Sequence, residues 1–433
     1  MGWMRDENGL EKNNANYIPL TPLSHINRAA EVFPDREAVI YGNHRKTWLE
    51  TKHRCSKLAD ALSKMGVKPG DVVATVIPNL PAQVEAHFGI PACGAVLNTI
   101  NTRLEKQTIS YILSHGEAKV VLVDSQFLSV VEEAIEMMEE VSPKIIEVAD
   151  LEAGIVKSGK YPEYEDLISS ASSNYEWIMP KDEWESISLN YTSGTTGRPK
   201  GVVSHHRGSY LMTMGTVISW KMTLYPKYLT IVPLFHCNGW NHTWMMPLLG
   251  GTIVCCRDIT AKAIYAAIAN EGVTHFGGAP IVLNMITGAP ENDRKQLKQK
   301  VHVLTAGAPP PSIIFKKMKN LGFEVMHVYG LTETYGHVTQ CAWNDEWNEF
   351  DEDKQNEIKA RQGVRYPNTE GVTVMDPETM TEVPKDGKTI GEIMIRGNVV
   401  MKGYFKDKDA TEKAMAGGWF HSGAVSYTHL RAH

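Results

Sequence analysis

Residues 191–201 read Tyr-Thr-Ser-Gly-Thr-Thr-Gly-Arg-Pro-Lys-Gly and follow an apolar, strand-like run at 187–190. Glycine reaches backbone conformations that other residues avoid, so successive N–H groups of such a loop can converge on an anion. The hydroxyl groups add donors, and the lysine adds a mobile positive charge that suits a phosphate. We therefore predict a polyphosphate-binding loop that uses Thr192, Ser193, Gly194, Thr195, Thr196, Gly197 and Lys200.

This loop differs from the Walker P-loop, which needs a glycine, four further residues and then Gly-Lys-Ser/Thr. Here the fourth residue after Gly194 is Arg198, and Pro199 and Lys200 follow it. A P-loop NTPase or kinase is therefore a disfavoured alternative, and it would release ADP rather than AMP. A polar surface turn is the other alternative, because Gly, Ser and Thr occupy turns for local reasons. The ordered string favours a phosphate loop of another kind.

Two more motifs follow predicted strands, at the strand ends where open α/β sheets gather ligands. Residues 327–334 read His-Val-Tyr-Gly-Leu-Thr-Glu-Thr. A tyrosine can stack on a purine, a threonine can bond a phosphate and a glutamate can hold Mg²⁺, although a strand before a capped helix would look similar. Residues 305–309 read Thr-Ala-Gly-Ala-Pro. Their small side chains either let the main chain approach a flat ring or form a tight turn.

Residues 233–242 read Pro-Leu-Phe-His-Cys-Asn-Gly-Trp-Asn-His, and they offer a different site. His236, Cys237 and His242 have a spacing that could suggest a metal. A structural zinc site needs four ligands, and no partner cysteine pair is nearby, so metal binding is disfavoured. A core position remains an alternative for His242. Trp240 offers an apolar wall for a substrate.

The composition indicates a globular protein with a large core. The chain has 433 residues, of which 42% are hydrophobic and 22% charged, and its net charge is −6 without a long basic run. A nucleic-acid surface is therefore not indicated. The most apolar stretch, 244–256, is broken by proline and glycine and is too short to span a membrane. The six cysteines show no framework spacing and indicate reduced thiols in a cytosol-like compartment.

Strand-like runs alternate with helical patterns along most of the chain, which predicts parallel sheets covered by helices. Thr47 and Glu50 form the sequence signature of a capping box that opens a helix over 47–65. Further helices are predicted over 261–271 and 312–321. The strands are predicted at 72–77, 119–123, 144–148, 229–233, 252–255, 273–276, 301–305 and 324–328. After about Gly336, shorter strand signals at 372–375 and 392–396 predict a small antiparallel or barrel-like unit.

In this order, the motifs resemble those of the acyl-adenylate-forming (AMP-binding) superfamily, which includes acyl-CoA synthetases, aryl-CoA ligases and luciferases. Residues 17–23 and 98–105 resemble its branch of fatty acyl-, benzoate- and cinnamate-CoA ligases. The resemblance implies an α/β fold, with two parallel-rich, helix-covered sheets and a small distorted β-barrel subdomain. It implies one large domain over 1–423, divided at about 1–190, 191–336 and 337–423.

The resemblance also implies the reaction and its residues. The chain is expected to be an ATP-dependent carboxylic acid:CoA ligase, forming an acyl adenylate and then a thioester, with ATP, Mg²⁺ and coenzyme A. Catalytic roles fall on Lys200, Thr332, Glu333 as the Mg²⁺ ligand, and His236. The resemblance adds nucleotide-binding roles for Gly307, Ala308, Pro309, His327, Tyr329, Gly330 and Thr332. The acid pocket would be lined by His236, Trp240, Ala306 and Val328, whose largely apolar walls favour a short- or medium-chain fatty acid or an aromatic acid.

Two departures from the family pattern concern the end of the sequence. Residues 391–397, 403–405 and 418–423 resemble the last motifs of the large domain. The family then places a ribose-binding aspartate directly after the glycine, where this chain has Ala424. Residues 424–433 are expected to be a non-native tail, and the family's small C-terminal domain to be absent. This product would then be weakly active or inactive, and a fragment that binds nucleotide or acid without turnover is the alternative.

The remaining expectations concern binding partners and cellular location. The partners would be a small carboxylic acid, ATP and CoA, with no nucleic acid and no membrane span, and the sequence does not indicate an oligomeric state. A cytoplasmic location is expected, or a peroxisomal one if the native C-terminus carries a targeting signal.

Overall fold

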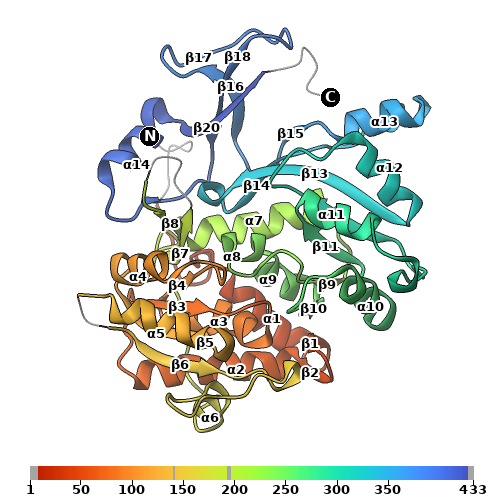
Figure 1. The fold of residues 1–433 in the computed structure, drawn as a ribbon. Helices are drawn as coiled ribbons and strands as arrows, with labels where there is room; N and C mark the ends of the chain where they lie inside the picture. Colours follow the sequence, from red (N-terminus) through yellow and green to blue (C-terminus); the bar gives the residue numbers. More distant parts are fainter. Residues whose placement is uncertain (1–7, 140–141, 193–196, 428–433) are drawn as a thin grey trace.

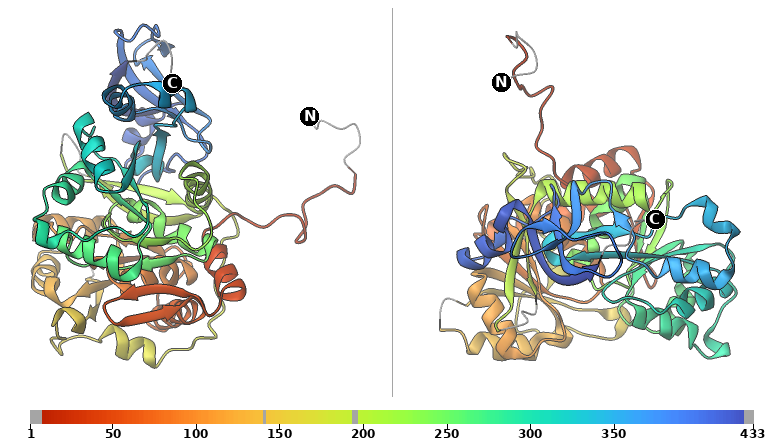
Figure 2. Two further views of the ribbon diagram at one scale, coloured as in Figure 1. Left: turned by 90° about the vertical axis from the view of Figure 1, so that its right-hand side faces the viewer. Right: turned by 90° about the horizontal axis from the view of Figure 1, so that it is seen from above.

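The computed structural model describes residues 8–139, 142–192 and 197–427. Two large sheets and one small sheet make up the molecule, and the small sheet stands at one end above the other two (Figure 1). Residues 8–17 extend away from the body (Figure 2). Within the described residues, no helix has both the length and the apolar character needed to cross a membrane.

The first large sheet has seven strands, which are parallel except where β8 pairs with its two neighbours. In spatial order they are β19 (Gly403–Tyr404), β8 (Lys200–His205), β7 (Ser186–Thr192), β4 (Val96–Thr99), β3 (Val72–Val76), β5 (Ala118–Asp124) and β6 (Lys144–Val148).

The second large sheet has nine strands, and its central strands are parallel. In spatial order they are β15 (Val364–Arg365), β14 (Gly336–Gln340), β13 (Phe323–Leu331), β12 (Val301–Thr305), β11 (His275–Gly278), β9 (Lys227–Leu229), β10 (Thr252–Val254), β1 (Glu37–Tyr41) and β2 (His44–Thr47). The small sheet is antiparallel, with β17 (Thr381–Glu382), β16 (Gly371–Asp376), β18 (Ile390–Arg396) and β20 (Phe420–Tyr427).

Helices cover the large sheets. The main hydrophobic core of the molecule contains residues from both large sheets. The helices are α1 (Leu23–Val32), α2 (Trp48–Lys64), α3 (Pro81–Ala92), α4 (Lys106–His115), α5 (Leu128–Glu136), α6 (Tyr164–Ser169), α7 (His206–Ser219), α8 (Cys237–Trp240), α9 (His242–Met245), α10 (Ala261–Glu271), α11 (Pro280–Thr287), α12 (Ser312–Asn320), α13 (Glu352–Lys359) and α14 (Lys408–Ala414). The predicted capping box is confirmed, because Glu50 N donates to Thr47 Oγ1 and Thr47 N donates to Glu50 Oε2.

The strand predicted over 229–233 is wrong, because β9 ends at Leu229. In the segment that follows β9, the side chain of Asn79 makes hydrogen bonds to backbone groups that a neighbouring strand would otherwise pair. Its Nδ2 donates to the carbonyls of Thr230 and Val232, at 2.6 and 3.4 Å, and its Oδ1 accepts from Leu234 N at 2.8 Å. This amide satisfies the backbone outside the ladder, so an apolar run that looks like a strand turns away.

The sheets exchange strands across the expected boundary at residue 190. That boundary falls inside β7, and β1 and β2, from the start of the chain, join the nine-stranded sheet. β19, from beyond residue 400, joins the seven-stranded sheet. Residues 424–427, which the sequence analysis left out of the fold, continue β20 and pair with β18. Ladder pairing uses backbone groups, so it does not depend on which side chains this segment carries. The division into three contiguous subdomains stays a proposal.

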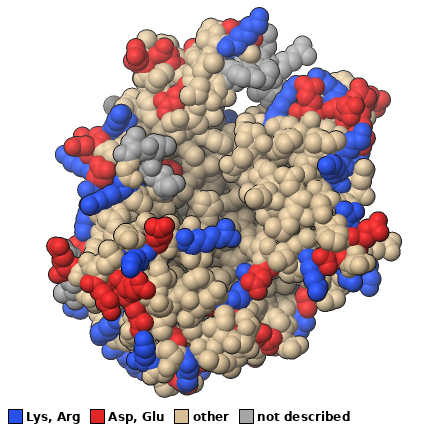
Figure 3. All heavy atoms as spheres, in the orientation of Figure 1, with Lys and Arg blue, Asp and Glu red and all other residues tan. Residues whose placement is uncertain are grey.

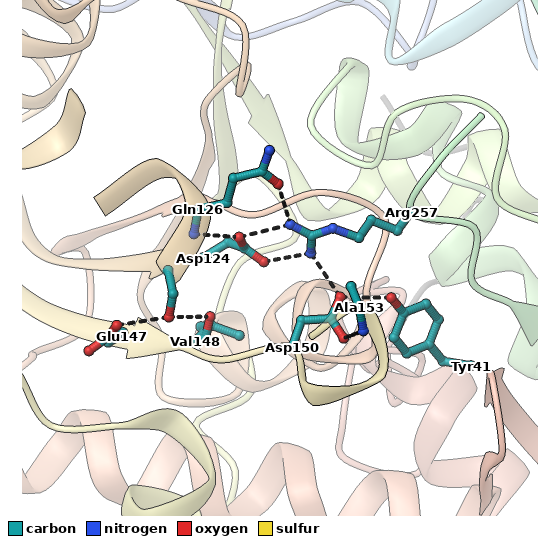
Figure 4. A network of polar contacts seen from close by, with 9 residues as sticks. Tyr41, Asp124, Gln126, Glu147, Val148, Asp150, Ala153 and Arg257 are labelled. Atoms are coloured by element: carbon teal, nitrogen blue, oxygen red, sulfur yellow. Dashed lines mark hydrogen bonds and ion pairs between the residues drawn. The ribbon is translucent and has the colours of Figure 1, made fainter. Parts of the chain in front are cut away.

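A buried ion network ties the two large sheets together (Figure 4). Arg257, which follows β10, makes two hydrogen bonds to Asp124 at the end of β5, at 2.7 and 3.0 Å. It also donates to Asp150 Oδ2 at 2.9 Å, and Asp150 Oδ2 accepts from the hydroxyl of Tyr41 in β1. Side chains from both sheets thus meet in one network.

Candidate functional site

The predicted phosphate loop connects the two strands of a hairpin. β7 ends at Thr192 and β8 begins at Lys200, and these two residues are register partners. Thr192 and Lys200 are half-buried, and Gly197 is exposed. Ser193, Gly194, Thr195 and Thr196 lie outside the described residues. The face of the molecule drawn in Figure 3 is hollowed between the part that carries the small sheet and the part below it.

Lys200 and Glu333, which are 133 positions apart in the chain, both contact the side chain of one tyrosine. The Nζ atom of Lys200 lies 4.7 Å from the ring centre of Tyr404. The hydroxyl of Tyr404 donates to Glu333 Oε1 at 3.0 Å. Glu333 belongs to the 3-10 turn η5 (Thr332–Thr334), which directly follows β13. The two predicted motifs therefore face a common neighbour, although nothing in the sequence analysis gave Tyr404 a role.

The His236 segment joins the same site through short polar contacts. Cys237 Sγ and Thr332 Oγ1 lie 3.1 Å apart. Asn190, near the end of β7, donates from Nδ2 to Asn238 Oδ1 at 2.6 Å. These contacts bring the segment before the phosphate loop, the η5 turn and α8 into one place.

The backbone of α8 is unusual. Residues 237–241 all have positive φ, between +44° and +62°, although only Gly239 is a glycine. Side chains disfavour this left-handed region, so such a run persists only where its surroundings hold it. The buried amides of Asn238 and Asn241 supply that support, because each is hydrogen-bonded to another segment. Strained backbone of this kind clusters at functional sites.

The three apolar residues proposed to line the acid pocket are buried. Trp240, Ala306 and Val328 are buried in one hydrophobic cluster. The ring of Trp240 packs edge-on against His337 at 4.9 Å. A Cβ on Gly277 would lie 3.0 Å from that indole ring, so glycine lets β11 approach it. His337 was missed, because it lies on β14, seven residues beyond Gly330, outside any motif considered.

Other predicted nucleotide-binding residues lie beside this site. β12 pairs in parallel with β13, so Thr305 and His327 are register partners, and residues 307–309 are exposed just beyond β12. A Cβ on Gly330 would overlap the backbone of Gly336, so the β13–β14 pairing requires glycine there. Tyr329 is half-buried. Burial raises the pKa of its hydroxyl. The ring packs against a hydrophobic cluster that contains Phe420 of β20.

Two histidines have structural surroundings. His327 is 1% exposed, and its Nδ1 lies 3.0 Å from the carbonyls of Ala360 and Arg361. That position ties β13 to the segment after α13 and does not favour the nucleotide-binding role predicted for it. His242 is fully buried, with Nδ1 2.8 Å from the hydroxyl of Tyr228, so it occupies a core position.

The site keeps its histidines neutral. His236 is exposed to solvent at the edge of the site. Desolvation by the protein around it still lowers the pKa of its ring. Burial lowers the pKa of His337 to about 3 and raises that of Cys237 to about 12. Neutral imidazoles and an uncharged thiol leave Lys200 and Glu333 as charged groups of the site.

The donor set fits a metal held jointly by protein and substrate. Among the described residues, no group of three or more His, Cys, Asp or Glu side chains could hold a metal by itself. Mg²⁺ is commonly bound by one or two carboxylates together with substrate phosphates. Glu333 beside a lysine suited to phosphate matches that arrangement.

A cavity of about 240 Å³ lies on the outer side of the hairpin. The lining residues include Gly197, Lys200, Tyr111, His115 and Tyr404. It shares Lys200 and Tyr404 with the site described above, and so belongs to the surroundings of the phosphate loop.

Comparison with curated sequences gives close relatives. One is an acetate/butyrate–CoA ligase of Arabidopsis thaliana, described as peroxisomal, which is 47% identical over 440 residues, covering 98% of this chain and 77% of that protein. An acetate–CoA ligase of Humulus lupulus is 48% identical over 438 residues, with the same coverage. A trans-cinnamate:CoA ligase of Petunia hybrida, described as peroxisomal, is 42% identical over 435 residues, covering 97% and 76%.

Solved structures share the fold. The N-terminal domain of FACL13 from Mycobacterium tuberculosis superposes with a TM-score of 0.79 at 23% identity, covering 94% of this chain and 96% of that one. The anthranilate CoA ligase AuaEII gives a TM-score of 0.84 at 19% identity, covering 97% and 78%. Residues 26–405 match the family described as AMP-binding enzyme. The chain therefore belongs to the AMP-binding enzyme family.

Proposed function

We propose that the protein is an ATP-dependent carboxylic acid:CoA ligase. The observation that carries the proposal is the placement of Lys200 and Glu333 around Tyr404, next to the strained α8 segment. A phosphate-binding lysine, a carboxylate for Mg²⁺ and an apolar pocket are the parts that joining a nucleotide to an acid requires. The names of the relatives, all acid:CoA ligases, support the same reaction.

The reaction would proceed in two steps. A carboxylate oxygen of the acid attacks the α-phosphorus of ATP, and the bond to the leaving pyrophosphate breaks. The thiol sulfur of coenzyme A then attacks the carbonyl carbon of the acyl adenylate, and AMP leaves. The first step brings two anions together, so catalysis depends mainly on positioning and on neutralising charge.

The residues of the site divide this work. Lys200 and the loop donors would hold the outer phosphates, and Thr332 would bond a phosphate oxygen. Glu333 would hold Mg²⁺, which when bound neutralises charge on the phosphates. The ring of Tyr329 would lie against the purine. The neutral His236 would stand at the carboxylate end of the acid pocket.

The acid would be short or medium in length, or aromatic. Trp240, Ala306 and Val328 are apolar, and apolar walls favour an aliphatic or aromatic acid over an amino acid, whose ammonium group would need a carboxylate partner. The relatives act, by their names, on acetate, butyrate and cinnamate. A reducing compartment, cytosolic or peroxisomal, fits the six buried, unpaired cysteines.

A second candidate is a protein that binds nucleotide or acid without turnover. This candidate is motivated by Ala424, whose side chain offers no acceptor to a ribose hydroxyl where the family pattern has an aspartate, while the relatives' names favour the ligase.

Exchange of labelled pyrophosphate into ATP, with a panel of acids, tests the proposal. Acid-dependent exchange with AMP as product supports a ligase. Nucleotide binding by calorimetry without exchange supports the second candidate. Formation of ADP, or no binding of nucleotide at all, would refute both.

A further inference from the structure

Tyr404 lies on an edge strand that is docked beside the phosphate loop. β19 pairs with β8 in antiparallel register, with Tyr404 opposite Val202 and Gly403 opposite Val203. Lys200 is two residues from Val202 on the same strand, so its side chain points to the same face of the sheet. Diagonal neighbours of this kind are within reach of a tyrosine ring and a lysine. The contact between Lys200 and Tyr404 thus follows from the register.

Backbone hydrogen bonds hold both segments in place around this tyrosine. Phe405 N donates to the carbonyl of Gly201 at 2.7 Å. Met401 N donates to the carbonyl of Glu333, also at 2.7 Å. The five residues 401–405 therefore connect the phosphate hairpin to the η5 turn, and the side chain of Tyr404 contacts a charged group of each.

The two ends of the Tyr404 side chain make different contacts. The face of its ring receives the ammonium group of Lys200, which a cation–π attraction favours. Its hydroxyl donates to the Glu333 carboxylate at 3.0 Å. A carboxylate oxygen can only accept a hydrogen bond, so the hydroxyl is the donor in this contact. Mutation can remove the hydroxyl alone, or the ring together with the hydroxyl.

We propose that Tyr404 is a positioning residue that holds Lys200 by its ring and Glu333 by its hydroxyl in the geometry that receives the nucleotide and its Mg²⁺. The inference rests on the proposed function, because it assumes that these two groups bind Mg-ATP. Partners of a metal ligand orient it and tune its affinity, so the hydroxyl acts on Mg²⁺ through Glu333. The ring acts on the phosphates through Lys200.

The test separates the two contacts by calorimetric titration of ATP into the chain at a series of Mg²⁺ concentrations. Tyr404→Phe keeps the ring and removes the hydroxyl, so we expect the Mg²⁺ concentration for half-maximal enhancement of binding to rise by about tenfold, the lower end of the effect of losing a metal ligand's partner. Binding of ATP without Mg²⁺ should change little. Tyr404→Leu should also weaken that metal-free binding, by about two- to fivefold, as a lost cation–π contact predicts.

Tyr161→Phe is a matched control. The hydroxyl of Tyr161 also donates to a glutamate, Glu132, at 2.9 Å. Glu132 lies on α5, which follows β5, a strand separated from β8 by three others in the seven-stranded sheet. Tyr161→Phe should leave both titrations unchanged. In a Glu333→Gln background, Tyr404→Phe should have no further effect on the Mg²⁺ dependence, because the group that it orients is gone. Thermal melting of every variant distinguishes a local effect from general unfolding.

The outcomes separate this inference from the function on which it rests. A wild-type chain that binds no ATP overturns both. If the wild type binds Mg-ATP and Tyr404→Phe shows an unchanged or lower Mg²⁺ requirement, the positioning role is overturned and the proposed function stands. Equal losses in Tyr404→Phe and Tyr404→Leu, with and without Mg²⁺, would show that the residue merely maintains the fold.

Discussion

Replacing Arg257 by methionine should destabilise the protein strongly, although this arginine is remote from the nucleotide motifs in the sequence. Its side chain is 7% exposed, and those of Asp124 and Asp150 are 0% and 3% exposed. Methionine fills similar space but leaves two carboxylates in the interior without their cation. The carboxylates stay beside Gln126 and Tyr41, as Figure 4 shows, and neither of these is charged.

The expected size follows from the burial. Removing one partner of a buried ion pair costs about 3–5 kcal/mol, mainly because the remaining charge is left uncompensated. At an unfolding entropy of about 2.1 cal/mol/K per residue, this cost lowers the melting temperature of a cooperative 433-residue chain by about 3–6 °C. The same network joins β5 to β10 and β1, so the loss should affect both large sheets together.

Thermal unfolding followed by circular dichroism and by calorimetry measures the shift. Lys157→Met is the control, because Lys157 and Asp166 are equally close, at 2.6 Å, but 52% and 69% exposed. An exposed pair contributes little, so the control should melt like the wild type. Asp124→Asn should lower the melting temperature less in the Arg257→Met background than in the wild type. In that background it removes a buried carboxylate that has already lost its cation. The reasoning is refuted if Arg257→Met melts within error of Lys157→Met.

Three further changes test the site and the core. Ala424→Asp should tighten binding of AMP, because it adds an acceptor for ribose hydroxyls, and calorimetry would show a Kd lower by about tenfold or more, the scale of one hydrogen bond to a charged group; unchanged affinity would contradict the ribose role. Lys200→Met should weaken ATP binding more than AMP binding, because the lysine is proposed to hold the outer phosphates; equal losses would contradict that assignment. Stability should fall between pH 7 and pH 5: burial lowers the pKa of His87 to about 4, so the unfolded chain takes up a proton near the ordinary pKa of 6.5 while the folded chain does not. The stabilisation is complete above pH 6.5 and is lost as the pH falls toward 4, and His87→Gln should reduce the dependence of the urea midpoint on pH.

Local signals in the sequence predicted the elements that local chemistry determines. The helix at 261–271 and the strand at 301–305 have the bounds expected of them, because the signals that define them are local: the residue pattern of each segment and, for the helix, the adjacent caps Thr260 and Gly272. Thr47 and Glu50 interact across three residues and were predictable for the same reason. The strand at 229–233 failed because Asn79, about 150 positions earlier, takes up the backbone groups of that segment. No local pattern carries that information.

The same distinction applies to the site. Lys200, Glu333 and Trp240 stand in motifs whose residue types indicate their chemistry. His337 and Tyr404 were missed as members of the site because their roles arise from register. His337 reaches Trp240 because β14 folds back along β13, and Tyr404 reaches Lys200 because β19 pairs with β8 across about 200 positions. Gly403-Tyr-Phe405 was visible as a motif, but the sequence gave no indication of which strand it would join.

The left-handed run at 237–241 connects fold and function. Its non-glycine residues occupy a costly region of backbone space, of order 1–3 kcal/mol each. The compensation comes from outside the run: Asn190 bonds Asn238 from the end of β7, and Asn241 bonds the carbonyl of Tyr335 just before β14. These supports belong to the two sheets that carry Lys200 and Glu333. Trp240 can therefore keep its strained geometry only while both sheets hold their places, so the proposed acid pocket and the proposed phosphate loop depend on the same arrangement of the two sheets.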